Sequence, residues 1–143
     1  MGLLKCAGGL LLASLCLASP VAAGVASPAR RFACASPDEA FIRTTLYFGL
    51  GQRLGWISAR QWRSFLRHEV TVRFPQGFTV LDAQGQWRGE SGMIMRERSK
   101  VLLIIHRDTP ESWNDIHALI ALYRARYDQE LVLQEDAEVC ATF

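Results

Sequence analysis

Residues 78–106, "FTVLDAQGQWRGESGMIMRERSKVLLIIH", contain two predicted strands in succession and decide the fold. The first strand covers residues 78–83, and Gln84 and Gly85 favour a turn. The second strand covers residues 93–106 and ends in the apolar run "VLLII". Two strands this close in sequence pair as an antiparallel hairpin. The centre of the chain is therefore a β-hairpin.

A predicted amphipathic helix precedes the hairpin at residues 58–70. Ser58 stands three positions before Gln61, the spacing of a capping box, and Ile57 and Trp62 have the spacing of a hydrophobic staple. Arg60, Arg63 and Arg67 belong to its solvated face. Pro75 and Gly77 end the helical pattern. The apolar positions at helical spacing are Trp62, Phe65, Leu66 and Val70.

A second helix is predicted after the hairpin, at residues 110–127. Thr109 suits the N-cap, and Pro110 suits the first helical position because its missing N–H would be unpaired there. A strand is predicted on each outer side, at residues 41–49, where apolar and polar residues alternate, and within residues 130–143. The apolar positions of the helix are Trp113, Ile116, Ile120, Tyr123 and Tyr127.

The predicted order is strand, helix, strand, strand, helix, strand. This order is typical of the ferredoxin-like split-βαβ fold, an α+β class in which both helices cover one face of a four-stranded antiparallel sheet. We predict one such domain at residues 41–143. Residues 24–40 are small and polar and are predicted to be a flexible lead-in.

Residues 1–23 have the pattern of a signal peptide. A positively charged start is followed by an apolar run, "CAGGLLLASLCLA", and then by "SPVAA", with small residues at the expected cleavage position after Ala23. The run is shorter than the roughly 20 residues that a membrane-spanning helix needs. We therefore expect an exported protein, periplasmic or extracellular, with no membrane anchor after cleavage.

Cleavage would leave two cysteines, Cys34 and Cys140. In an oxidising compartment we predict that they form a disulfide. The alternative is two unpaired buried thiols.

The charge balance excludes some partners. With 16 Lys and Arg against 14 Asp and Glu, the net charge of +2 gives no reason to expect nucleic acid or a membrane surface as a partner. His68, His106 and His117 lack the spacing of metal ligands, so we predict neither a metal nor a cofactor.

The segments "TTLYFGL", "RFPQGFTVLDAQGQWR", "RERSKVLLIIH" and "VCATF" resemble an exported bacterial family catalogued as domain of unknown function 3574. The similarity covers about residues 41–143. Val72 departs from the family pattern "TPRFP", which has proline there. The resemblance implies no activity. The positions that match its motifs are Tyr47, Phe48, Gly49, Arg73, Pro75, Gly77, Gly85, Trp87, Glu97 and Ser99.

Basic residues gather along the second hairpin strand. Alternation places Arg96, Arg98 and Lys100 on one face of that strand. If the helices leave this face open, it meets Arg43, Thr45 and Tyr47 of the first strand and forms a floor that can bind a carboxylate or phosphate through bidentate arginine contacts.

The alternative is a solvated hairpin arm in which Glu97 neutralises its neighbours, since exposed ion pairs contribute little. Arg73 and Trp87 favour a pocket over this alternative. The candidate ligand-binding residues are therefore Tyr47, Arg73, Trp87, Arg96, Glu97 and Arg98.

Two functional hypotheses follow. The first is a binding module whose open, arginine-rich sheet face holds a small anionic molecule or a second copy of the chain. The second is a small cofactor-free enzyme with a pocket at a homodimer interface, using Arg73, Glu97 or His106. An enzyme needs these groups to converge in an enclosed pocket, whereas a module can leave them on a flat surface.

Overall fold

The computed structural model describes residues 33–52, 55–88 and 92–143, which lie in one compact unit, Arg31–Phe143. The predicted signal peptide and residues 24–32 of the predicted lead-in lie outside the described residues. Among the described residues, no helix has both the length and the apolar character needed to cross a membrane.

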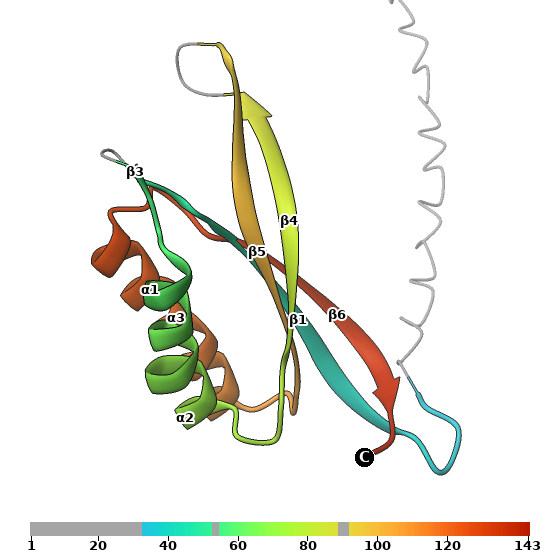
Figure 1. The fold of residues 1–143 in the computed structure, drawn as a ribbon. Coiled ribbons are helices and arrows are strands. Elements are labelled where there is room, and N and C mark those ends of the chain that lie inside the picture. Colours follow the sequence, from blue (N-terminus) through green and yellow to red (C-terminus); the bar gives the residue numbers. More distant parts are fainter. Residues whose placement is uncertain (1–32, 53–54, 89–91) are drawn as a thin grey trace, which may run out of the picture. The chain divides into compact units, whose positions relative to one another are not determined.

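The sheet has four antiparallel strands in the order β4-β5-β1-β6 (Figure 1). The two central strands, β1 and β5, therefore come from opposite halves of the sequence. This order and pairing confirm the predicted ferredoxin-like topology. The strand bounds are Glu39–Gly49 for β1, Thr79–Arg88 for β4, Ile94–His106 for β5 and Leu133–Ala141 for β6.

Both helical segments cover the same face of the sheet, as predicted (Figure 1). The first consists of α1, Ala59–Phe65, a π-helical turn η1, Leu66–Val70, and α2, Thr71–Arg73. The second is α3, Pro110–Tyr127. A short hairpin that the sequence did not predict, β2 at Gly51–Gln52 and β3 at Gly55–Trp56, connects β1 to the first helix.

The predicted helix caps are present. The Ser58 hydroxyl accepts a hydrogen bond from the backbone N–H of Gln61, while the Gln61 side chain accepts one from the backbone N–H of Ser58. Thr109 directly precedes Pro110 at the helix start, and its hydroxyl accepts a hydrogen bond from the N–H of Ser112. These caps satisfy N–H groups that have no partner within the helix.

An aromatic cluster joins the helices to the sheet. The ring of Phe48 on β1 lies 4.5 Å from that of Tyr123 on α3 and 5.7 Å from that of Phe65 on α1, measured between centroids. The Tyr123 hydroxyl donates a hydrogen bond of 2.7 Å to the Gly49 carbonyl, so this buried polar group is paired. Leu119 is also fully buried, although the sequence analysis did not select it.

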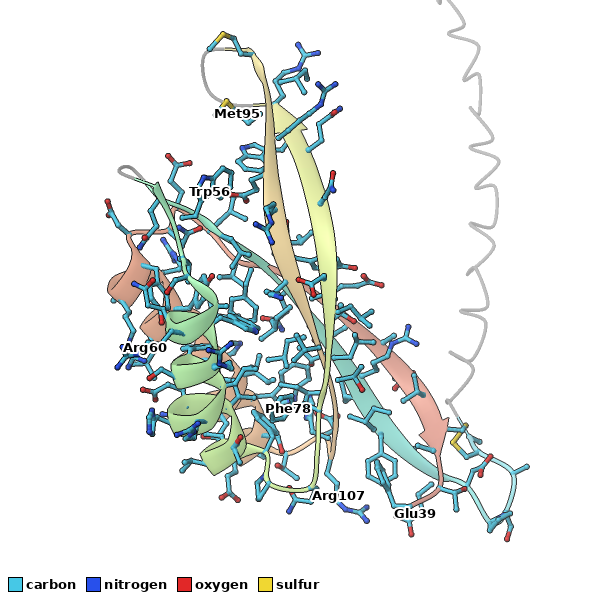
Figure 2. All side chains as sticks on the ribbon, in the orientation of Figure 1. Glu39, Trp56, Arg60, Phe78, Met95 and Arg107 are labelled. Atoms are coloured by element: carbon cyan, nitrogen blue, oxygen red, sulfur yellow. A yellow bond between two sulfur atoms is a disulfide. The ribbon has the colours of Figure 1, made fainter. Side chains whose placement is uncertain are left out.

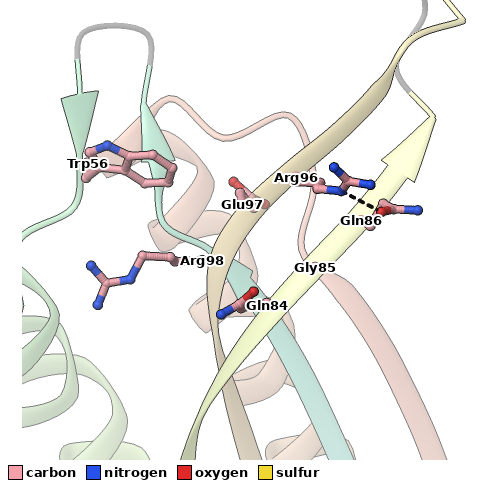
Figure 3. Close-up of a pocket in the computed structure, with 7 residues that line it drawn as sticks. All are labelled: Trp56, Gln84, Gly85, Gln86, Arg96, Glu97 and Arg98. Carbon is pink, nitrogen blue, oxygen red and sulfur yellow. Dashed lines mark hydrogen bonds between the residues drawn. The ribbon is translucent and has the colours of Figure 1, made fainter.

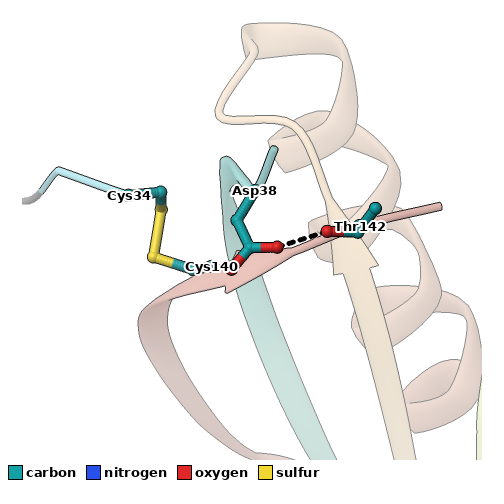
Figure 4. Close-up of a disulfide and its surroundings, with 4 residues drawn as sticks. All are labelled: Cys34, Asp38, Cys140 and Thr142. Carbon is teal, nitrogen blue, oxygen red and sulfur yellow. Dashed lines mark hydrogen bonds between the residues drawn. A yellow bond between two sulfur atoms is a disulfide. The ribbon is translucent and has the colours of Figure 1, made fainter. Parts of the chain in front are cut away.

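Cys34 and Cys140 form a disulfide, with Cα atoms 5.6 Å apart (Figure 4). The Thr142 hydroxyl donates a hydrogen bond to the Asp38 carboxylate beside it. The predicted lead-in extended to residue 40, but Glu39 and Ala40 already belong to β1 and pair with Ala141 and Cys140. The strand therefore starts two residues before the predicted domain boundary because β6 offers it a partner there.

The predicted turn at Gln84 and Gly85 is wrong. Both residues lie inside β4, where Gln84 pairs with Arg98 and Gly85 with Glu97. The pairing continues to Arg88, so the ends of β4 and β5 project beyond the helices as a two-stranded arm (Figure 1). Glycine at position 85 leaves room across the arm, because a Cβ there would lie 3.1 Å from the Ser99 hydroxyl oxygen.

Candidate functional site

The arginines of β5 lie on the side of the sheet that carries the helices. Leu102 pairs with Leu46, and both side chains are fully buried under the helices. Alternation then places Arg96 and Arg98 on that same side, beyond the end of the helices. The predicted anion-binding floor required Arg96 and Arg98 to lie on the same open face as Tyr47. The structure does not meet this condition, and the open face is not arginine-rich.

A pocket lies between the arm and the short β2–β3 hairpin (Figures 2 and 3). It has a volume of about 480 Å³ and is open to solvent. Trp56 of β3 stands on one side of it with 57% of its surface exposed. The other lining residues come from β4 and β5 and are Gln84, Gly85, Gln86, Arg96, Glu97 and Arg98.

The two arginines of the pocket differ from Lys100, their neighbour on the same side of β5. Lys100 forms an ion pair with Asp82. Arg96 donates a hydrogen bond of 2.8 Å from Nε to the Gln86 side-chain oxygen, which orients its guanidinium group (Figure 3). Within the described residues, no carboxylate forms an ion pair with Arg96 or Arg98. Their guanidinium groups are therefore available to an anion from solution.

Glu97 is held against two glycines at the end of β1. Its Oε2 accepts a hydrogen bond of 3.1 Å from the N–H of Gly51. A Cβ on Gly49 would overlap with Oε1, so the carboxylate occupies space that only glycine leaves free. Burial raises the pKa of Glu97 above its ordinary value, and the hydrogen bond from Gly51 opposes this shift.

We expect Gly49→Ala to displace the Glu97 side chain. Loss of the hydrogen bond from Gly51 costs about 1.5–3 kcal/mol, but the displaced carboxylate regains its hydration and removing a glycine from a strand returns about 0.5–1 kcal/mol, so the free energy of unfolding should change by less than about 1 kcal/mol. Exposure to water should lower the pKa of Glu97 towards its ordinary value, which NMR titration of the carboxyl carbon measures. An unchanged pKa of Glu97 in the folded variant would contradict this account.

Three of the predicted site residues lie elsewhere. Arg73, at the end of α2, forms ion pairs with Glu69 at 3.1 Å and with Asp115 at 3.7 Å. The Tyr47 hydroxyl donates a hydrogen bond of 3.0 Å to Glu135, which raises the pKa of Tyr47.

Trp87 pairs with Met95 near the tip of the arm. The structure therefore brings Arg96, Glu97 and Arg98 together, without Tyr47, Arg73 or Trp87. The pocket residues that the sequence analysis missed are Trp56, Gln84 and Gln86.

His106 is also separated from the pocket. Its Nε2 lies 2.9 Å from the Thr44 hydroxyl oxygen and its Nδ1 lies 2.9 Å from the Arg107 carbonyl oxygen. Its ring packs edge-on against Trp113. With both ring nitrogens engaged and the side chain buried, His106 belongs to the core. The described residues contain no cluster of His, Cys, Asp and Glu side chains that would hold a metal ion.

The sheet order and the helices on one face define a ferredoxin-like α+β domain, here with an open pocket at a projecting hairpin. Residues 43–143 match the family described as "Protein of unknown function (DUF3574)", and the chain belongs to this family. No curated protein matches the sequence significantly.

Two kinds of solved structure are similar to the chain. One is a phage SAM lyase in complex with S-methyl-5′-thioadenosine, with a TM-score of 0.54, 17% sequence identity and coverage of 72% of this chain and 90% of the lyase. The other is CutA from Synechococcus elongatus, with a TM-score of 0.50, 12% identity and coverage of 73% of this chain and 82% of CutA. At these identities the similarity shows the fold alone.

Proposed function

We propose that this protein is an exported binding module whose pocket holds a small anionic ligand with a flat, conjugated part. The observation that carries this proposal is the position of an exposed tryptophan, Trp56, in the same pocket as two arginines that pair with no carboxylate among the described residues. Export is supported by the pattern of residues 1–23 and by the disulfide, since disulfides persist in oxidising compartments.

The chemistry of the lining residues defines the ligand class. A flat ring system can stack on Trp56, and stacking of a nucleic-acid base on an aromatic side chain contributes about 1–3 kcal/mol. Arg98, and Arg96 oriented by Gln86, can donate paired hydrogen bonds to a phosphate or carboxylate. The amide groups of Gln84 and Gln86 offer both donors and acceptors to a sugar or heterocycle.

The size of the pocket agrees with such a ligand. Its volume of about 480 Å³ falls within the range of about 300–1,000 Å³ typical of small-molecule sites. The S-methyl-5′-thioadenosine bound by the similar phage lyase has a flat purine but no anionic group. Adenosine and adenosine monophosphate are therefore suitable probes, because they differ only in the phosphate that the arginines would bind.

We expect adenosine monophosphate to raise the melting temperature of the wild type more than adenosine does. A ligand that binds only the folded state stabilises it by mass action. Arg98→Ala should weaken binding at least tenfold, because hydrogen bonds to charged groups contribute about 1.5–3 kcal/mol. Thermal-shift assays and titration calorimetry measure both effects.

The matched control is Arg67→Ala, which removes an exposed arginine from the helical segment and should leave binding unchanged. Trp56→Ala should weaken both probes, since both contain the purine. If the wild type responds to neither these probes nor a broader set of aromatic phosphates and carboxylates, the proposal is wrong.

The environment of Glu97 favours a second candidate, a cofactor-free enzyme. A partly buried carboxylate with a raised pKa that also lines a pocket can act as a general acid or base. If the wild type converts a bound ligand chemically, and Glu97→Gln stops the conversion but still binds the ligand, the protein is an enzyme and not only a binding module.

A further inference from the structure

The sheet face without helices is unusually apolar. We call it the open face and define it by the odd-numbered positions of β4, β5, β1 and β6, which lie side by side in the strand register. The helices cover the opposite face (Figure 1). Large apolar side chains of the open face that remain exposed are Leu81, Trp87, Met95, Ile105 and Leu133.

The apolar run of β5 contributes to both faces of the sheet. Leu102 and Ile104 are buried under the helices, whereas Val101, Leu103 and Ile105 belong to the open face. An antiparallel sheet with one solvated face normally alternates apolar and polar residues, and a continuous apolar run is typical of a strand covered on both sides.

The exposed apolar side chains stand in three places on this face: Leu81 and Leu133 at the two edges of one row across the sheet, Trp87 with Met95 near the tip of the arm, and Ile105 beside Arg43. Exposed apolar surface is typical of an interaction site.

We propose that the open face binds the open face of a second copy of this chain, forming a twofold-symmetric homodimer. The two arginines of the pocket, Arg96 and Arg98, lie on the opposite side of β5, so the proposal does not rest on the ligand-binding function, although the open face shares Gly85 and Glu97 with the pocket lining. The charged positions of the open face, within the described residues, are Glu39, Arg43, Glu97 and Glu135.

The charges of the open face favour a copy of the chain over other occupants. Arg43 and Glu135 lie on neighbouring strands, so one face offers both a cation and an anion. A twofold contact requires a self-complementary surface, which a patch of mixed sign can provide. A membrane surface would instead favour a cluster of cations, whereas the cations on this side of the sheet stand among carboxylates: Arg43 lies near Glu135, and Arg107, directly after β5 and 4.9 Å over the Phe41 ring, forms an ion pair with Glu39.

The area of the open face is sufficient for a specific dimer. Each strand residue covers about 3.3 by 4.8 Å, so nine residues on each of four strands cover roughly 570 Å². The strands are staggered, and β4 lies level with β6 only at Thr79–Leu81. Covering this area on two copies removes roughly 1,100 Å² from solvent, above the limit of about 1,000 Å² for a biological interface.

Sedimentation velocity of the full exported chain tests the proposal. We expect the wild type to have twice the mass of the chain, and Leu81→Glu and Ile105→Glu to have the mass of one chain. Both side chains are partly exposed, at 51% and 38%, so both variants should keep the wild-type circular dichroism spectrum. Leu81→Ser and Ile105→Ser are milder replacements with the same expected loss of the dimer if the glutamates prevent folding.

The matched control is Val72→Glu. Val72 is an apolar residue with 70% exposure on α2, outside the sheet, and its replacement should leave the dimer intact. A wild type that is monomeric at high concentration overturns the proposal, whatever else covers the open face. Retention of the dimer in the glutamate variants would also overturn it.

A mixing experiment tests the twofold charge pairing. Arg43→Glu and Glu135→Arg should each weaken the dimer, because each places like charges opposite one another across the twofold axis. Mixing the two variants should restore a dimer, since the carboxylate introduced at position 43 of one chain then meets the guanidinium group introduced at position 135 of the other. Failure of the mixture to dimerise, while the wild type does, would overturn the pairing of Arg43 in one chain with Glu135 in the second copy.

Discussion

Replacing Phe65 with alanine is expected to lower the free energy of unfolding by about 3–5 kcal/mol, the range for removing a fully buried phenylalanine. Phe65 has no exposed surface, and its ring lies 5.1 Å from that of Tyr123 and 5.7 Å from that of Phe48. The loss is large because this one ring connects α1, α3 and β1, whose close packing cannot collapse into the cavity. Urea denaturation of both proteins measures it.

The matched control is Phe143→Ala. Phe143 is 84% exposed and contacts the ring of Phe41 at the end of the chain. The same chemical change there should cost less than about 1 kcal/mol, as most surface substitutions do. Similar losses in the two variants would show that the aromatic cluster does not determine the stability of the fold.

The main elements of the fold were predictable because each of their sequence patterns is compatible with only one type of secondary structure. Ser58 with Gln61, and Thr109 with Pro110, mark helix starts by local hydrogen bonding that does not depend on tertiary context. The turn was mispredicted because glycine is also used where strands approach closely, and Gly85 is such a position opposite Glu97.

The site was less predictable for two physical reasons. The run "VLLII" is apolar at both odd and even positions, so the sequence alone does not decide which side of β5 faces the helices. Trp56 follows a glycine in a short hairpin with no periodic pattern, and only the fold brings it to Arg96 and Arg98. Residues from distant parts of the sequence meet there, because β1 and β5 are neighbours in the sheet.

Removal of the disulfide is the second change with a large expected effect. Cys34 and Cys140 are separated by 106 positions, and the chain-entropy model assigns a crosslink of this length about 4–5 kcal/mol. We expect the double variant Cys34→Ser, Cys140→Ser to be less stable than the unreduced wild type by about 2–5 kcal/mol, the range for native disulfides of small exported domains. Urea denaturation measures the difference.

A reducing agent provides the control, because it should destabilise the wild type and leave the double variant unchanged. Intact-mass analysis should show that the unreduced wild type gains two hydrogens on reduction. Two alkylatable thiols in freshly isolated, unreduced protein would contradict the pairing.

Loss of the disulfide should also increase aggregation, by a route separate from global stability. Cys140 lies on β6, an edge strand of the sheet, and the crosslink holds the segment before β1 beside that edge. An edge strand with unpaired N–H and C=O groups can pair with another chain. Light scattering under conditions where the double variant is still folded should therefore increase with time, and Asp38→Ala, which loses only the side-chain hydrogen bond from Thr142, should scatter less. Equal scattering by the two variants would show that the crosslink does not protect the edge.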